Sequence, residues 1–135
     1  KVETAIRLLH EPTAIDAAAS ERRAQLQNQK VALFRLRINL ALSQRGYFRP
    51  RDVPSPLWRS RAGKGKIRVN PEHRDFPAIL AELLDILAAK RWEPRKAAVL
   101  FEVSASQLIK LLKAEPRALA LVNAQRAQAG MHSLK

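Results

Sequence analysis

Apolar and more polar residues alternate at the start of the chain, a pattern typical of a half-buried β-strand. The alternating positions are Val2, Thr4, Ile6 and Leu8. The residues His10-Glu11-Pro12 then predict a turn, and we expect a returning strand over 13–19. This second strand is the weaker prediction, because alanine and aspartate are poor strand formers.

From about Ala24 to Leu42 the apolar residues change to a helical period. They form two stripes: Leu26, Leu33, Leu36 and Leu40 in one, and Val31, Phe34, Ile38 and Leu42 in the other. A helix with two apolar stripes is expected to pack against the hairpin on one side and against something else on the other. Residues 1–42 therefore predict a β-β-α segment.

Residues 43–72 have the composition of an Arg-rich linker loop, with several prolines and glycines, and Asp52 is the single acid of residues 43–70. The segment is too long to be an idle connection in a compact fold. Tyr47, Phe48 and Trp58 are interleaved with the arginines. Such a mixture suits stacking on unpaired bases and neutralisation of phosphates. It equally suits aromatic side chains that pin the loop onto the helical part, and the sequence leaves both interpretations open.

Residues 73–135 predict an all-helical bundle. Asp75 is a candidate cap for a helix of about 76–91, and Glu93-Pro94 begins a second, short helix. Ser104, with a glutamine three residues later, predicts a capping box for a helix of roughly 105–114. Pro116 opens a last helix that ends before Gly130. The predicted fold class is α+β, with three parts: 1–42, 43–72 and 73–135.

Composition narrows the possible partners. The 135 residues include 25 Lys plus Arg and 12 Asp plus Glu, a net charge of +13. The first 70 residues carry 15 of these basic side chains and only 5 of the acidic ones. Such an excess predicts a polyanionic partner such as RNA or DNA. The absence of cysteine excludes a disulfide scaffold or a Cys-based zinc site, and no apolar run is long enough to span a membrane.

Residues 95–113 have the spacing of a helix-turn-helix, with Val103 in the turn and Leu108, Leu111 and Leu112 in the core. Glu102 occupies the position where glycine is usual, a position that favours a left-handed backbone. If the motif binds DNA, we expect its second helix to present Ser106, Gln107 and Lys110 to base edges in a major groove. The alternative is that three short helices simply pack in this way.

A further pattern lies in the first forty residues. Arg7, His10, Pro12, Thr13, Arg23, Gln25, Asn28 and Ala32 stand in the order and spacing found in bacterial class I peptide chain release factors. The matching segment of that family follows the Gly-Gly-Gln loop of the catalytic domain, and the resemblance covers about a third of the chain. Three positions depart from the family: Ala14 replaces a glycine, Ala24 a serine and Leu26 a histidine. The changes indicate a divergent member, and the lost serine removes a helix cap worth about 1 kcal/mol.

The resemblance implies a partial release-factor catalytic domain followed by the helical bundle. It also implies a Gly-Gly-Gln loop upstream of Lys1, where the chain begins without an initiator methionine or a signal-peptide pattern. That loop would promote peptidyl-tRNA ester hydrolysis on the ribosome, in translation termination or ribosome rescue in the bacterial cytoplasm. No catalytic residue, metal or cofactor is assigned to this chain, and we expect a monomer with ribosomal RNA and peptidyl-tRNA as partners. The expected RNA-binding residues are Arg22, Arg23, Gln25, Asn28, Lys30, Arg45, Arg49, Arg51, Trp58, Arg59, Arg61, Lys64, Lys66 and Arg68.

Two other functions remain open from the sequence. A transcriptional regulator could bind DNA through the helix-turn-helix, in which case binding would survive moderate salt. A basic protein-interaction module would bind neither nucleic acid tightly. Ribosome rescue is favoured over codon-dependent release, because these residues contain no separate decoding domain.

Overall fold

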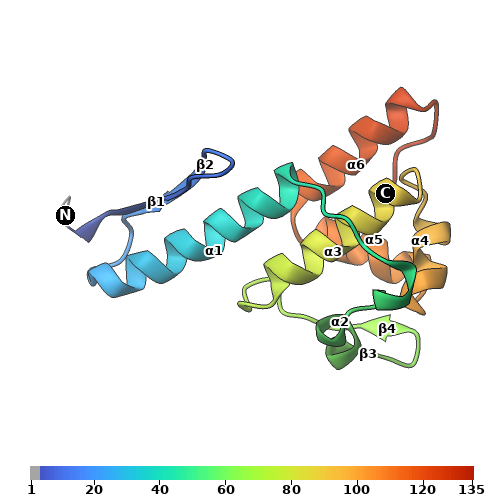
Figure 1. Ribbon diagram of the computed structural model, residues 1–135, viewed down its shortest axis with the longest axis horizontal. Helices are drawn as coiled ribbons and strands as arrows, with labels where there is room; N and C mark the ends of the chain where they lie inside the picture. The colour runs from blue at the N-terminus through green and yellow to red at the C-terminus, as the bar shows by residue number, and fades with distance from the viewer. Residues whose placement is uncertain (1–3) are drawn as a thin grey trace. The chain divides into compact units, whose positions relative to one another are not determined.

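The computed structural model describes residues 4–135, and the beginning of the predicted first strand, at Val2, lies outside them. The chain divides after Gln44 into two compact units, the second of which is Arg45–Lys135. Together their elements make an α+β fold that ends in a helical bundle (Figure 1). The predicted fold class is therefore confirmed.

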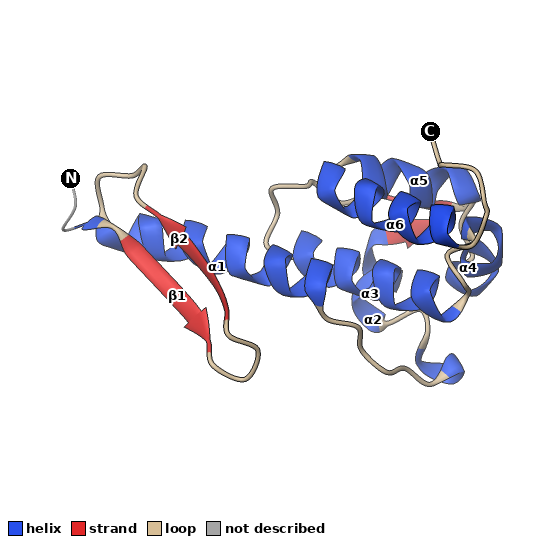
Figure 2. Ribbon diagram, turned by 90° about the horizontal axis from the view of Figure 1, so that it is seen from above, coloured by secondary structure: helices blue, strands red, loops and turns tan. Residues whose placement is uncertain are grey.

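The first unit is a hairpin and a long helix, the β-β-α order expected from the hydrophobic pattern. Strands β1 (Ile6–His10) and β2 (Ile15–Ala19) pair antiparallel, with Ile6 opposite Ala19 and His10 opposite Ile15. Helix α1 (Gln25–Ser43) lies along the hairpin (Figure 2). The alanine-rich second strand forms despite its low propensity, because Ala17 and Ala19 are buried where it packs on α1.

The predicted stripes of α1 are partly wrong. Leu26 and Leu33 are 62% and 49% exposed. In their place, Asn28, Ala32 and Leu36, spaced four residues apart, form one buried row. The small alanines of β2 allow the helix to approach closely with a small side chain of its own, so bulky leucines are not needed here.

The turn between β1 and β2 is held by local hydrogen bonds. The His10 Nδ1 and Thr13 Oγ1 atoms lie 2.8 Å apart, and Ala14 N donates to the His10 carbonyl at 2.8 Å. Ala14 has a φ of 60°, in the left-handed region. This is the position where the resembling family has glycine, and an alanine there costs about 1 kcal/mol of strain.

The core of the second unit surrounds helix α3 (Phe76–Ala89). Helices α4 (Pro94–Phe101), α5 (Ala105–Lys113) and α6 (Pro116–Gln128) follow, close to their predicted bounds. Helix α3 is apolar around most of its circumference, as expected of a helix buried on several sides. Its fully buried side chains are Phe76, Ile79, Leu80, Leu83, Leu84, Ile86 and Leu87.

The segment predicted as an Arg-rich linker loop is largely folded into this second unit. It contains a 3₁₀ turn (Pro50–Asp52), helix α2 (Pro56–Arg61) and the short strands β3 (Ala62–Gly63) and β4 (Lys66–Ile67). Trp58 is the reason, because it is completely buried and stacks on Phe101 of α4 with ring centroids 3.8 Å apart. The aromatic side chain thus anchors the segment on the helices, one of the two predicted roles.

Candidate nucleic-acid interface

The loop that precedes α1 is fixed by the buried side chain of Asn28. Its Oδ1 accepts a hydrogen bond from Arg22 N at 2.9 Å, and its Nδ2 donates to the carbonyls of Thr4 (2.7 Å) and Arg22 (3.0 Å). Both ends of the amide are therefore used inside the protein. Asn28 was predicted to contact RNA, but the structure makes it the residue that positions the loop.

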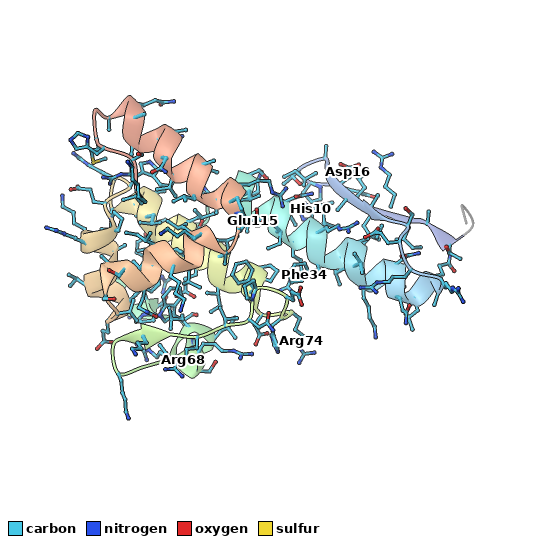
Figure 3. All side chains as sticks on the ribbon, turned by 180° about the vertical axis from the view of Figure 1, so that it is seen from behind. His10, Asp16, Phe34, Arg68, Arg74 and Glu115 are labelled. Atoms are coloured by element: carbon cyan, nitrogen blue, oxygen red, sulfur yellow. The ribbon has the colours of Figure 1, made fainter. Side chains whose placement is uncertain are left out.

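Two other arginines of this unit form ion pairs with acidic residues of the same unit. Arg7 pairs with Asp16 across the hairpin at 2.8 Å, and Asp16 is labelled in Figure 3 beside His10. Arg35 of α1 pairs with Glu21 and also donates to the Ala18 carbonyl at 2.9 Å. The hydrogen bond from Arg35, helped by backbone N–H groups, lowers the pKa of Glu21 to about 2. Glu21 therefore stays ionised and holds Arg35 near the hairpin.

The cations on and next to this loop are different, since they have no acidic partner within residues 4–135. Arg22, Arg23 and Lys30 are exposed, and none forms an ion pair within the described residues. Gln25, at the start of α1, is exposed as well. The result is a set of exposed cations, with Arg22 and Arg23 on the loop whose backbone is held by Asn28 and Lys30 in the helix α1 that follows. Unpaired cations on a fixed backbone are suited to contacting phosphates.

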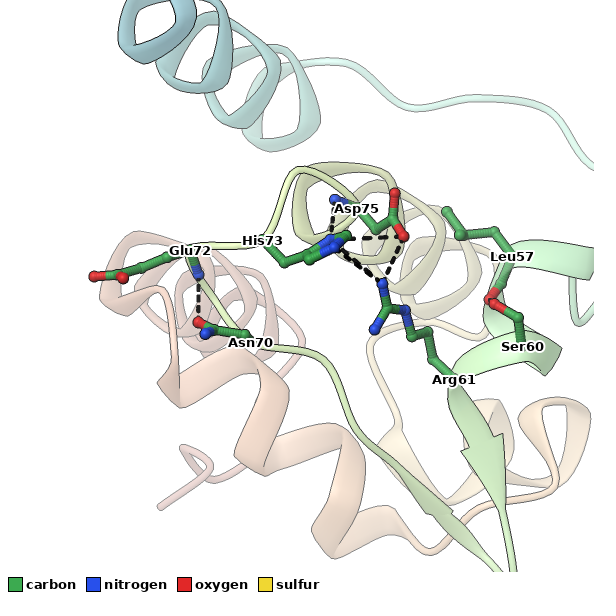
Figure 4. A network of polar contacts seen from close by, with 7 residues as sticks. All are labelled: Leu57, Ser60, Arg61, Asn70, Glu72, His73 and Asp75. Atoms are coloured by element: carbon green, nitrogen blue, oxygen red, sulfur yellow. Dashed lines mark hydrogen bonds and ion pairs between the residues drawn. The ribbon is translucent and has the colours of Figure 1, made fainter. Parts of the chain in front are cut away.

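Two arginines of the second unit are instead used within the fold. Arg61 donates to the Asp75 carboxylate at 2.8 Å and lies 3.3 Å from the His73 ring nitrogens (Figure 4). Asp75 N donates to His73 Nδ1 at 3.0 Å. Asp75 is the residue directly before α3, as predicted, but its side chain does not cap the helix. Its carboxylate binds Arg61 instead, and this hydrogen bond lowers the pKa of Asp75.

Arg45 is also held internally, at the start of the second unit. Its guanidinium lies 3.6 Å from Asp85 of α3, which accepts a hydrogen bond from Gly46 N at 2.8 Å. Burial raises the pKa of Asp85 and lowers the pKa of Arg45, so partial desolvation outweighs their attraction. Arg45 therefore joins Arg61 among the predicted RNA-binding arginines that have a structural role.

Helices α4 and α5 are in contact and are joined by a short turn, as the helix-turn-helix spacing predicts. Glu102, between them, has a φ of 55°, so a glutamate adopts the left-handed conformation that usually selects glycine. Val103 is buried in the turn, and Leu108, Leu111 and Leu112 of α5 are buried as predicted. The two helices and their turn are thus held together by the apolar residues that the spacing predicts.

The residues of the predicted capping box at the start of α5 also form hydrogen bonds with the β3–β4 hairpin. Ser104 Oγ accepts from Gln107 N at 3.2 Å, as predicted. The Gln107 side chain does not return to Ser104, because its Oε1 accepts from Ile67 N at 3.1 Å. Ser104 N donates to the Gly65 carbonyl at 3.2 Å instead. A bidentate contact to adenine needs both ends of a glutamine amide, so Gln107 is not free to read a base in this arrangement.

No family model matches the chain. No solved structure matches it either. Within residues 4–135, no helix combines the length and apolar character needed to cross a membrane. The same residues contain no cluster of three or more His, Asp or Glu side chains arranged to hold a metal ion.

The structure thus separates the predicted RNA-binding residues into two sets. Asn28 and Trp58 are buried, and Arg45 and Arg61 are paired with acids. The exposed set without an ion pair among the described residues is Arg22, Arg23, Gln25, Lys30, Arg49, Arg51, Arg59, Lys64, Lys66 and Arg68. Burial of Trp58 leaves Tyr47, which is 94% exposed, as the aromatic side chain in this segment most accessible to a base.

Sequence reasoning missed the β3–β4 hairpin and its contact with α5. The signal was present in the sequence Gly63-Lys64-Gly65-Lys66. Lys64 and Gly65 both have positive φ, 54° and 76°, as a tight two-residue hairpin turn requires. The composition of this segment is also that of a loop, and composition does not distinguish a loop from a tight hairpin turn.

Proposed function

We propose that this chain is the scaffold and RNA-binding part of a release-factor-like protein that acts in ribosome rescue or translation termination in the bacterial cytoplasm. The observation that carries the proposal is the loop before α1. Its backbone is held by Asn28, and it presents Arg22 and Arg23, exposed cations that form no ion pair with the other residues that the structure describes. Arg23 and Asn28 are also two of the positions on which the resemblance to class I release factors depends.

In this proposal the β1–β2 hairpin and α1 hold a Gly-Gly-Gln loop that would precede β1 in the full-length protein. No Gly-Gly-Gln sequence occurs in these 135 residues. Hydrolysis of the peptidyl-tRNA ester would then depend on that loop together with ribosomal RNA, and this chain would contribute binding and orientation. Arg22, Arg23 and Lys30 would neutralise ribosomal phosphates.

Ribosome binding and peptide release test the proposal. The full-length protein is expected to co-sediment with ribosomes at low salt and to release peptide from stalled complexes. The variant Arg22→Ala/Arg23→Ala should weaken co-sedimentation, because two unpaired cations are lost. The matched control Arg95→Ala/Lys113→Ala removes the same charge from exposed positions of α4 and α5. Equal behaviour of both variants, or binding no better than that of an unrelated protein of equal charge, would refute the proposal.

The helix-turn-helix arrangement of α4 and α5 supports a second candidate, a DNA-binding regulator. Lys110 and Ser106 lie on the exposed side of α5, where a recognition helix would face the major groove. This candidate predicts sequence-specific binding to duplex DNA that survives moderate salt. Selection of a preferred sequence from a random duplex library would support it, and a library with no enrichment would exclude it.

A further inference from the structure

A groove runs along α5 in the second unit, between that helix and the chain that leaves the β3–β4 hairpin. Its volume is about 490 Å³. One wall is the extended chain from Ile67 to Pro71, and the other contains Gln107, Lys110 and Leu111 of α5. The groove is thus formed by one helix and one hairpin strand with its continuation.

The walls of the groove are fixed to each other by two hydrogen bonds, one to a side chain and one between backbone groups. Ile67 N donates to the Gln107 side chain at 3.1 Å, and Ser104 N donates to the Gly65 carbonyl at 3.2 Å. Arg68 N donates to the Arg61 carbonyl at 2.9 Å, which extends the hairpin pairing by one residue. The groove is therefore defined before any ligand arrives, which lowers the entropic cost of binding.

The charge of the groove is positive. Arg68 and Lys110, from opposite walls, are exposed and form no ion pair within the described residues (Arg68 is labelled in Figure 3). Arg61 also lines the groove, but Asp75 partners it at 2.8 Å. None of the described residues that line the groove is acidic. Lys64 and Lys66 add exposed positive charge on the adjacent hairpin.

The shape of this surface favours an unpaired strand over a duplex. The hairpin turn contacts the N-terminal end of α5 through Gly65, at the end of the helix that a helix-turn-helix inserts into a major groove. Besides these cations, the groove is lined by apolar residues such as Val69 and Leu111. A cationic groove that follows a sugar–phosphate chain is the usual site for single-stranded nucleic acid.

We propose that the groove between Ile67–Pro71 and α5 binds the backbone of an unpaired RNA strand, with Arg68 and Lys110 contacting its phosphates from the two sides. The choice of RNA over DNA rests on the proposed ribosomal function. The groove itself selects by backbone charge and strand geometry, so its recognition is largely independent of base sequence. It would give the second unit an RNA contact separate from the loop before α1.

Fluorescence anisotropy of the 135-residue chain with a labelled RNA of about 12 nucleotides, without self-complementarity, tests this proposal. The variant Arg68→Ala/Lys110→Ala is expected to bind roughly tenfold more weakly and to reduce the slope of log K against log salt by about 1.4, the value for two single-strand phosphate contacts. The control Arg95→Ala/Lys135→Ala removes one arginine and one lysine outside the groove, and we expect less than a twofold change. Near-ultraviolet circular dichroism, which senses the Trp58–Phe101 stack, verifies folding of both variants.

Two outcomes would overturn the proposal: equal losses for the two variants, or tighter binding of the duplex form of the same RNA. This test uses free RNA and groove residues, whereas the test of the proposed function uses ribosomes and Arg22 with Arg23. The two tests therefore distinguish a protein that binds ribosomes but whose groove does not bind RNA from one whose groove binds RNA but which does not act in ribosome rescue.

Discussion

Replacing Asn28 with alanine should unfold the loop before α1 while leaving the second unit intact. The change removes three hydrogen bonds and leaves Arg22 N and the Thr4 carbonyl without their partner. A hydrogen bond of this kind contributes about 1 kcal/mol, and a buried polar group left unpaired costs about 1–3 kcal/mol. We therefore expect the first unit to lose about 3 kcal/mol, or about two orders of magnitude in its folding equilibrium. Asn28→Asp keeps the shape but places a carboxylate oxygen against two carbonyls, so it should be no better.

Hydrogen exchange measured by NMR is the suitable assay, because it reports on each unit separately. Protection of the β1 and β2 amides should fall by about 100-fold in Asn28→Ala. Trp58 and Trp92 both belong to the second unit, so tryptophan fluorescence provides an internal control and should not change. If β1 and β2 kept their protection to within about threefold, the proposed anchoring role of Asn28 would be incorrect.

Four further changes test the local energetics. Ala24→Ser should stabilise α1 by about 1 kcal/mol in urea unfolding followed by circular dichroism, because Ala24 has the extended N-cap backbone but no capping side chain; an unchanged midpoint would contradict this. Glu102→Gly should raise the stability of the second unit by up to about 1 kcal/mol by relieving a left-handed glutamate, and a lower melting temperature would count against that strain. Trp58→Ala should cost the second unit about 4 kcal/mol, measured by Trp92 fluorescence in urea; a loss below 1 kcal/mol would disprove its anchoring role. The pKa of Glu21 is lowered from 4.5 to about 2 by Arg35, so the unfolded chain takes up this proton at a higher pH than the folded chain does. The free energy of unfolding should therefore fall as the pH drops from about 4.5 to about 2. Glu21→Gln should lack this pH dependence in acid unfolding, and an unaltered pH dependence would refute the role of Glu21.

Much of the fold follows from local pattern. The helix bounds of the second unit were predictable because Pro94 and Pro116 begin helices and Ser104 caps one. The β1–β2 hairpin was predictable from alternation and the turn residues. The inward face of α1 was not, because hydrophobicity ranks leucine above the small Ala32 and the polar Asn28 that pack there. Close approach to an alanine-rich strand, and one hydrogen-bonded amide, override that ranking.

The candidate site was less predictable than the fold. Composition could identify an Arg-rich segment, but it could not separate Arg61, whose partner Asp75 is fourteen residues away, from the unpaired Arg68. Nor could it reveal that Trp58 stacks on Phe101, because that contact joins segments more than forty residues apart. Both properties depend on tertiary contacts. The same is true of Gln107, whose side chain accepts a hydrogen bond from Ile67 N and does not complete the predicted capping box with Ser104.

The net charge of +13 says more about RNA binding when the cations that have an acidic partner are separated from those that have none. Arg7, Arg35, Arg45 and Arg61 are balanced by acids within the fold, so they add little to the attraction of a polyanion. The predicted RNA-binding cations that form no ion pair within residues 4–135 lie on the loop before α1, at Lys30 of α1 and on the Arg-rich segment of the second unit, and Lys110 of α5 has none there either. A cation with an internal partner must break that ion pair to contact a phosphate, whereas an unpaired one loses only solvent and counterions. Charge removal should therefore weaken RNA binding according to which cation is lost, and Arg22 or Arg68 should matter more than the equally charged Arg7 or Arg61.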